Sequence, residues 1–200
     1  MPGHIDHPVG IAHLKTKYMD KIKQIYISQT ETGYQLSACR YEFACVIGRS
    51  GLIAADKKRE GDGATPIGNW LLRSLFYRPD RTDVDMIRQR SLLPCRPITE
   101  HMGWVDDPVS PHYNQPIMLP CTARHEKLWR QDGLYDLILP LGYNDGPVTP
   151  HSGSAIFLHC AETDTPSTEG CVALQKSDLL MILPFCTSST LVTVQKQAEF

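Results

Sequence analysis

Proline and glycine recur along most of the chain, and this pattern limits the available folds more than any other feature. The 200 residues include 15 prolines and 14 glycines. Proline lacks a backbone N–H and interrupts helices, while glycine favours turns. The sequence therefore predicts many turns and short strands rather than a helical bundle.

Segments of alternating hydrophobicity lie between these turns, and alternation is typical of strands with one buried face. The predicted strands are residues 21–28, 34–47 (one or two strands), 67–77, 135–141, 155–161 and 190–194. In segment 155–161, Ile156 and Leu158 are predicted to face one way, and Phe157 and His159 the other.

The remaining segments predict little helix. Residues 125–130 are predicted as one or two helical turns, and residues 178–183 as a short helix capped by Ser177 and ended by Pro184. Residues 79–103 are predicted as an irregular polar segment that could cover a cleft, and 103–113 as loop. The expected fold is mainly β: a sandwich or partly closed barrel with one or two short helices.

Length and composition fit one globular domain. The chain is 42% hydrophobic and 21% charged, and we expect an arm at residues 1–20 and one domain at 21–200. The arm does not resemble a secretory signal, and no apolar run reaches the ~18 residues of a membrane span. The formal charge of −2 argues against a nucleic-acid partner, because such proteins need a basic surface.

The cysteines and histidines do not follow a metal-site pattern. The 7 cysteines include no Cys-x-x-Cys pair, which disfavours a zinc ribbon or a thioredoxin-like motif. His4, His7 and His13 fall in the predicted arm. No metal and no cofactor are predicted, and most cysteines are expected to be buried apolar residues.

The segment His159–Leu174, HCAETDTPSTEGCVAL, is the richest in chemistry. His159 ends an apolar strand, and a polar loop leads to Gly170 and Cys171. A nucleophilic cysteine needs a nearby base and backbone N–H groups for the oxyanion. The spacing permits a Cys171–His159 dyad with Gly170 in the turn, but it equally permits a hydrogen-bonded core histidine.

These residues resemble the catalytic domain of the YkuD-type L,D-transpeptidases, bacterial enzymes that cross-link peptidoglycan. That family carries a strand-borne histidine and, after a loop, Ser/Thr-His-Gly-Cys and an apolar residue; the matching positions here are His159 and Thr168–Val172. Residues 60–68, EGDGATPIG, and 153–159, GSAIFLH, resemble further family motifs. Residues 103–108, GWVDDP, and the pair Tyr113–Asn114 resemble a compact subgroup.

The resemblance implies a function and a location. Cys171 would attack an amide carbonyl of a peptidoglycan stem peptide, His159 would move the proton, and N–H groups at Gly170 and Cys171 would hold the oxyanion. An amine of a second stem would then take the acyl group from the thioester, and carbapenems would acylate the same thiol. The expected location is the bacterial periplasm or cell wall, and the expected assembly is a monomer.

Six further residues are predicted to contact the substrate. They are Thr168, Glu169, Trp104, Asp106, Tyr113 and Asn114. For Trp104, Asp106, Tyr113 and Asn114 a structural role weighs equally with a place in the cleft. Glu169 and Ala173 differ from the usual family residues, and the loop after His159 is shorter. Residues 60–68 are interpreted as a turn rather than a phosphate or metal loop.

The sequence also permits three other functions. The same dyad would serve an L,D-carboxypeptidase or another hydrolase of stem peptides. A non-catalytic cell-wall-binding module would keep the fold but bury an inert Cys171. A metal protein would use His159, Cys160 and Cys171, and would lose its fold with chelator.

Overall fold

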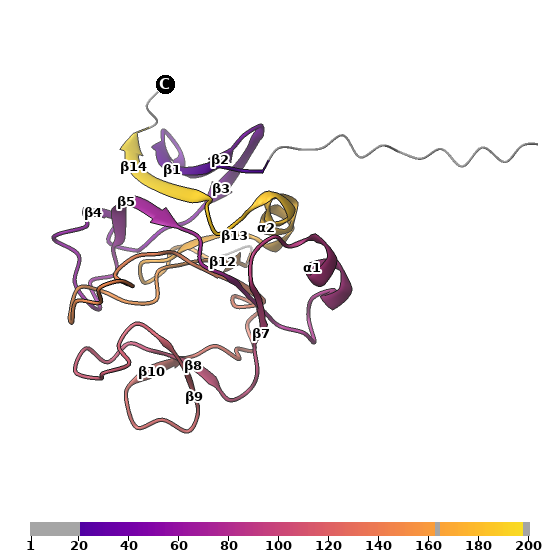
Figure 1. Ribbon diagram of the computed structural model, residues 1–200. Coiled ribbons are helices and arrows are strands. Elements are labelled where there is room, and N and C mark those ends of the chain that lie inside the picture. Colours follow the sequence, from indigo (N-terminus) through magenta and orange to yellow (C-terminus); the bar gives the residue numbers. More distant parts are fainter. Residues whose placement is uncertain (1–20, 163–164, 198–200) are drawn as a thin grey trace, which may run out of the picture.

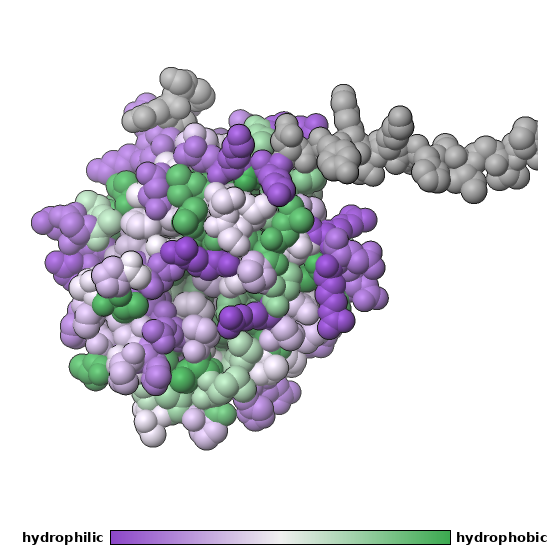
Figure 2. Space-filling view, in the orientation of Figure 1, coloured by the Kyte–Doolittle hydropathy of each residue, from purple (hydrophilic) through white to green (hydrophobic). Residues whose placement is uncertain are grey.

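The computed structural model describes residues 21–162 and 165–197 as three sheets with two short α-helices (Figure 1). The predicted arm at 1–20 lies outside the described residues. None of the described helices is long and apolar enough to cross a membrane. Hydrophobic residues on the face in Figure 2 form small separate areas among hydrophilic ones.

The largest sheet has six strands and joins the two ends of the described chain. Its strands, in spatial order, are β3 (Tyr41–Cys45), β2 (Gly33–Ala38), β1 (Gln24–Thr30), β14 (Leu191–Gln197), β5 (Thr65–Leu71) and β4 (Leu52–Ala54). β1 pairs in parallel with β14, with Ile25 opposite Val192. Alternating burial along both strands turns these apolar side chains to one face.

A five-stranded sheet carries the candidate dyad. Its order is β13 (Val172–Gln175), β12 (Phe157–Ala161), β11 (Leu137–Pro140), β6 (Leu75–Tyr77) and β7 (Cys95–Pro97). β12 and β13 are parallel, with Leu158 opposite Val172 and His159 opposite Ala173. The third sheet is smaller, with the order β10 (His125–Lys127), β8 (Met102–Val105) and β9 (Pro116–Met118).

The five-stranded sheet separates two hydrophobic cores. The main core, between the two larger sheets, includes Ile27, Leu36, Leu158, Leu174 and Val194. The smaller core, on the other face, contains Phe76, Ile98, Trp104, Leu128, Tyr135, Ile138, Phe157 and Cys171. Figure 1 shows the resulting layers, with β14 at one end and β8–β10 at the other.

Most predicted strands are confirmed, and the mainly β prediction holds with open, layered sheets. None of the described strands closes a barrel. The predicted faces of segment 155–161 are also confirmed, since Ile156 and Leu158 enter the main core and Phe157 the smaller one. The two elements after β13 are α2 (Lys176–Ile182) and a 3-10 turn, η1 (Leu183–Phe185).

Four local predictions were wrong. Residues 125–130 form no helix, because β10 pairs with β8 and takes its backbone hydrogen bonds across the strands. β8 lies partly within the predicted loop 103–113. Segment 79–103 contains α1 (Val84–Arg90), capped by the Asp83 carboxylate at the Met86 N–H, as well as β7. Gln175, not Ser177, is the residue before α2, and it makes no side-chain cap.

Candidate active site

Cys171 immediately precedes β13, and its sulfur is held between two backbone groups. Sγ donates to the Ala155 carbonyl oxygen at 3.0 Å and accepts from the Phe157 N–H at 3.4 Å. The residue is 9% exposed. The thiol is therefore fixed at the junction of β12 and β13, with its hydrogen directed at a carbonyl group.

His159 projects from β12 on the face of the smaller core. Its Nδ1 lies 2.8 Å from the Cys160 carbonyl oxygen. Since a carbonyl can only accept, the neutral ring carries its proton on Nδ1 and leaves the Nε2 lone pair unprotonated. The ring packs edge-on against Tyr135, with centroids 5.4 Å apart. The histidine thus has the tautomer that a general base needs.

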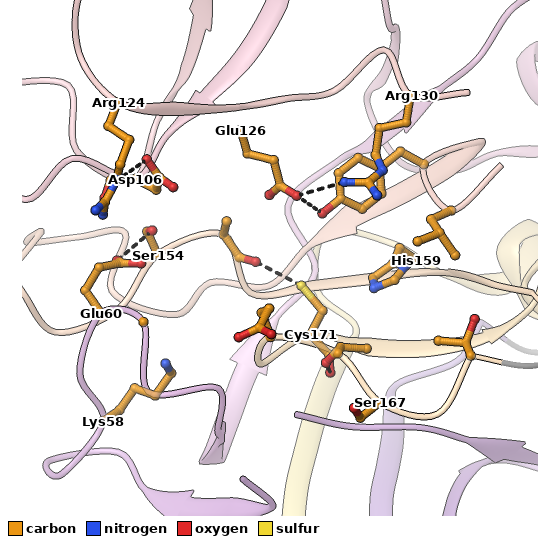
Figure 3. A pocket seen from close by; sticks show the side chains of 17 residues that line it. Lys58, Glu60, Asp106, Arg124, Glu126, Arg130, Ser154, His159, Ser167 and Cys171 are labelled. Carbon is orange, nitrogen blue, oxygen red and sulfur yellow. Dashed lines mark hydrogen bonds and ion pairs between the residues drawn. The ribbon is translucent and has the colours of Figure 1, made fainter. Parts of the chain in front are cut away.

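Both residues line one cleft of about 650 Å³ (Figure 3). Figure 3 shows Cys171 between His159 and Arg130 at one end and Arg124, Asp106 and Glu60 at the other. The other lining residues are Lys58, Gly61, Glu126, Leu134, Tyr135, Ser154, Ala155, Thr165, Ser167, Thr168 and Glu169. The cleft therefore carries charges of both signs around a buried sulfur.

A turn at Thr168–Cys171 fixes the backbone beside the sulfur. Gly170 has φ +134, and a Cβ there would lie 2.9 Å from the Ala64 carbonyl oxygen, so only glycine fits. The Thr168 hydroxyl accepts from the Gly170 N–H at 3.1 Å and donates to the Cys171 carbonyl oxygen at 2.7 Å. Because the Gly170 N–H is already bonded, an oxyanion contact from it would require that bond to break.

Burial keeps both members of the candidate dyad neutral. Burial raises the pKa of the Cys171 thiol to about 12, and the nearby Glu126 carboxylate adds to this. Burial also lowers the pKa of His159 to about 4. A thiolate–imidazolium pair would need the opposite shifts. The resting state is therefore a neutral thiol beside a neutral imidazole.

Two charged residues that the sequence analysis predicts to contact substrate, Glu169 and Asp106, line the cleft. Glu169, which follows Thr168 in the turn, forms an exposed ion pair with Arg49 at 3.0 Å. Asp106, at the end of β8, pairs with Arg124 at 3.0 Å. The structure thus brings Thr168, Glu169 and Asp106 to the cleft that holds Cys171.

Three other predicted contact residues lie outside the cleft lining. Trp104 is in the smaller core and packs edge-on against Phe157, with centroids 4.9 Å apart. The Tyr113 hydroxyl is bonded to the Glu60 carboxylate and accepts from the Gly153 N–H. Asn114 is 6% exposed, and its side chain bonds to Trp104 and to the backbone of Tyr143, Asn144 and Ala155. These residues support the cleft wall from behind.

Sequence reasoning missed a partly buried acidic group, Glu126, in the cleft that Cys171 lines. The Glu126 carboxylate on β10 accepts from the Tyr135 hydroxyl at 2.5 Å and lies 3.6 Å from Arg130 Nη1. Burial raises the pKa of Glu126. The Arg130 guanidinium stacks over Tyr135 at 5.0 Å from the ring centroid. The only sequence signal was an acidic and a basic residue four positions apart.

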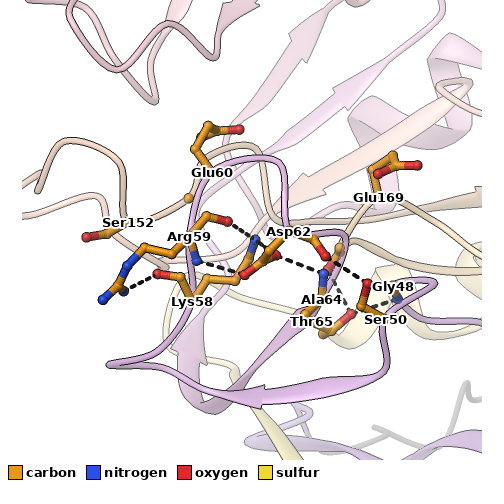
Figure 4. A network of polar contacts seen from close by, with 12 residues as sticks. Gly48, Ser50, Lys58, Arg59, Glu60, Asp62, Ala64, Thr65, Ser152 and Glu169 are labelled. Atoms are coloured by element: carbon orange, nitrogen blue, oxygen red, sulfur yellow. Dashed lines mark hydrogen bonds and ion pairs between the residues drawn. The ribbon is translucent and has the colours of Figure 1, made fainter.

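The loop at 55–64 is held by its own carboxylate (Figure 4), and the predicted turn at 60–68 ends at residue 64 because β5 begins at Thr65. Asp62 accepts from Lys58 Nζ at 2.5 Å, from the Arg59 N–H at 2.7 Å and from the Ala64 N–H at 2.9 Å. Although burial opposes it, these bonds lower the pKa of Asp62. Glu60, in the same loop, accepts from Ser154 at 2.8 Å and lines the cleft.

Comparison with known proteins identifies the fold. A family model described as the L,D-transpeptidase catalytic domain, YkuD, matches residues 23–194. The chain belongs to the YkuD family. No curated protein matches the sequence.

Solved structures resemble the chain weakly in sequence. L,D-transpeptidase 3 from Mycobacterium tuberculosis, in complex with a faropenem-derived adduct, is 13% identical over 86% of this chain and 60% of its own, with a TM-score of 0.40. Bd1075 from Bdellovibrio bacteriovorus is 12% identical over 92% and 51%, with a TM-score of 0.45. The helical cell shape determining protein Pgp2 from Campylobacter jejuni is 14% identical over 90% and 50%, with a TM-score of 0.44. The chain thus spans about half to three-fifths of their lengths.

The three residues of the alternative metal set do not converge in this YkuD domain. Cys160 belongs to the main core, whereas His159 and Cys171 line the cleft on the other face of the sheet. Over residues 21–162 and 165–197, no three His, Cys, Asp or Glu side chains are grouped to hold a metal ion.

Proposed function

We propose that this protein is a peptidoglycan L,D-transpeptidase that uses Cys171 as nucleophile and His159 as general base. The observation that carries the proposal is the shared cleft, in which a cysteine just before β13 and a histidine on β12, with its Nδ1 on a carbonyl oxygen, line the same space. Membership of the YkuD family supplies the substrate class, peptidoglycan stem peptides. The proposed place of action is the bacterial periplasm or cell wall.

Acylation begins from a neutral pair. The Cys171 S–H turns from the Ala155 carbonyl toward His159, and its proton passes to Nε2 as the sulfur attacks the amide carbon. The C–N bond of the tetrahedral intermediate then breaks. The leaving amine takes the proton from His159, and the acyl group remains on Cys171 as a thioester.

Transfer reverses these proton movements. The amine of a second stem peptide attacks the thioester carbon and gives its proton to His159. The C–S bond breaks, and the Cys171 thiolate takes the proton back from the imidazolium. Water in place of the amine would give a free carboxylate, which is the carboxypeptidase or hydrolase reaction.

The geometry also suggests how the substrate is held. Thr168, Glu169 and Asp106 line the cleft, and Lys58, Glu60 and Arg124 add charges of both signs. A stem peptide that carries both carboxylate and amine groups suits such a surface. Trp104, Tyr113 and Asn114 act on this surface indirectly, through the backbone and side chains that they hold.

The test is incubation of the purified protein with defined muropeptides, followed by mass spectrometry of the products. Cross-linked dimers that lack one leaving amino acid are expected, and Cys171→Ala should form none. Products shortened by one residue, without dimers, would establish the hydrolase reaction instead.

The state of the thiol favours one second candidate, a non-catalytic peptidoglycan-binding module. Cys171 is 9% exposed and hydrogen-bonded to backbone, and burial raises its pKa to about 12. Such a module would bind muropeptides in a pull-down but give no products, and its buried Cys171 would resist alkylation, whereas that of an enzyme would react fast.

A further inference from the structure

The carbonyl group that accepts the Cys171 thiol belongs to a residue with an unusual backbone conformation. Ala155 has φ 53, in the left-handed region that residues with a Cβ rarely adopt. An alanine keeps such a conformation only when its surroundings hold it there. The backbone preference of alanine therefore does not explain why the Ala155 carbonyl oxygen stays within hydrogen-bond distance of the Cys171 sulfur, and another group must hold it there.

Asn114 provides that support. Its Oδ1 accepts from the Ala155 N–H at 2.9 Å and from Trp104 Nε1 at 3.0 Å. Its Nδ2 donates to the carbonyl oxygens of Tyr143 at 3.0 Å and Asn144 at 2.8 Å. Both lone pairs and both hydrogens of the amide are thus used, so the side chain cannot turn without leaving buried polar groups unpaired.

We infer that Asn114 is a positioning residue for the nucleophile: by holding the Ala155 N–H, it keeps the Ala155 carbonyl on the Cys171 thiol and favours the protonated sulfur. A hydrogen bond that only the neutral form can donate disfavours ionisation. The consequence for catalysis rests on the proposed function, but the ionisation of Cys171 can be measured without turnover. A shifted titration in a protein without transfer activity would sink the proposed function and leave this inference intact.

Other charged and titratable groups also face the sulfur. The Glu126 carboxylate on β10 opposes ionisation of Cys171, and Lys58 favours it. His159 on β12 and Tyr135 before β11 line the same part of the cleft. The remaining charged lining residues are Glu60, Asp106, Arg124, Arg130 and Glu169. A substitution at Asn114 changes none of these groups, so a shifted titration would report on the backbone carbonyl.

The experiment follows the ultraviolet absorbance of the Cys171 thiolate against pH, as the difference between each protein and the same protein with Cys171→Ala. Asn114→Ala should move the titration to lower pH. Below the midpoint, the thiolate fraction should rise on the order of 3- to 10-fold, the effect of losing one hydrogen bond. An unchanged midpoint, or one at higher pH, would overturn the inference.

Asn144→Ala is the matched control. Asn144 also has a left-handed backbone, with φ 49, and its side chain also bonds to loop backbone: it donates to the Thr149 and Gly153 carbonyl oxygens and accepts from the Thr149 N–H. It has no bond to Ala155, so the thiol titration should stay at the wild-type position. A shift equal to that of Asn114→Ala would show that loosening the loop is enough, and would count against the inference.

A second variant covers the case in which Asn114→Ala does not fold. Asn114→Asp keeps an oxygen for the Ala155 N–H, and its second oxygen carries either a proton or a negative charge opposite the Tyr143 and Asn144 carbonyl oxygens. In either state the thiolate midpoint should stay at the wild-type pH or move above it. A midpoint below wild type in this variant would contradict the inference by itself.

Discussion

Cys160 and Cys171 lie on opposite faces of the same strand pair, and the difference between them shows what makes a cysteine a candidate nucleophile. Burial raises the pKa of both thiols to about 12. Cys160 packs in the main core, whereas Cys171 lines a cleft that His159 shares. The resting pKa of the thiol does not distinguish the two cysteines. What distinguishes Cys171 is its place in the cleft and its neighbouring base, His159.

The largest expected effect comes from replacing each of the two cysteines in turn. Cys171→Ala should lower acyl transfer by about 10⁴-fold or more, since the sulfur forms the covalent intermediate. Cys160→Ala should keep activity and lose on the order of 1 kcal/mol of stability. Muropeptide turnover gives the rates, and intact-mass analysis with a carbapenem should show one adduct, on the peptide containing Cys171. Activity lost with Cys160 instead would exchange the two roles.

The second prediction tests His159 as the general base. His159→Gln keeps a hydrogen-bonding side chain but should slow acylation by about 10²- to 10⁴-fold, the range for a positioned general base. With its pKa lowered to about 4 by burial, His159 can accept a proton through the neutral range, so the wild-type rate should fall only below about pH 5. In the variant, the rate should instead rise with pH as thiolate forms.

His112→Gln is the control for that variant. His112 is exposed and lies outside the cleft, so its substitution should leave the rate and its pH profile unchanged. Superimposable profiles of His159→Gln and wild type, in folded proteins, would rule out His159 as the base of Cys171.

A third prediction concerns stability against pH. The folded state holds His159 neutral, with its pKa lowered to about 4, while the unfolded chain takes up a proton near its ordinary value of ~6.5. The unfolded state therefore binds more protons between these values, and His159 stabilises the fold fully above pH ~6.5 and progressively less toward pH 4. The contribution is about 3 kcal/mol. Denaturant unfolding should show a smaller loss between pH 7 and 4 in His159→Gln than in wild type.

The smallest effect concerns the turn that distinguishes Cys171 from Cys160. Thr168→Val removes the hydroxyl that bonds the Gly170 N–H and the Cys171 carbonyl, and should lower stability by about 1–3 kcal/mol. The rate at which Cys171 is alkylated should also differ from that of wild type. Thr187→Val removes comparable bonds from a turn at Ser189, outside the cleft, and should leave alkylation as in wild type. Equal alkylation rates in wild type, Thr168→Val and Thr187→Val would show that the Thr168 turn does not affect the Cys171 thiol.

Local patterns predicted the parts of the fold that depend on local alternation. β12 is the clearest case, because period-two hydrophobicity assigned His159 and Leu158 to opposite faces. β10 could not be predicted this way, since a three-residue strand with two charged members has no pattern of its own and exists by pairing with β8. Short strands of this kind are set by tertiary contacts.

The candidate site could likewise be predicted only where its residues lie close together along the chain. Family motifs led to His159, Cys171 and Thr168, which are close along the chain. Glu126 and Lys58 reach the cleft from β10 and from the 55–64 loop, and only the three-dimensional arrangement brings them to the sulfur. The GWVDDP and Tyr–Asn motifs indicated an important region, but Asn114 faces inward and holds backbone.

The parallel pairing of β1 with β14 also governs the order in which this molecule can assemble. The largest sheet has at its centre two strands from opposite ends of the described chain, with Gln24 opposite Leu191. Closing so long a loop costs entropy before any contact offsets it, which places this topology among the slower folders. During synthesis, β1 must wait for its partner with one edge unpaired, at risk of pairing with another chain. β12 and β13 emerge before that partner, so the main core, where Leu158 and Leu174 lie with Val192 and Val194 of β14, can be completed only at the last step of folding.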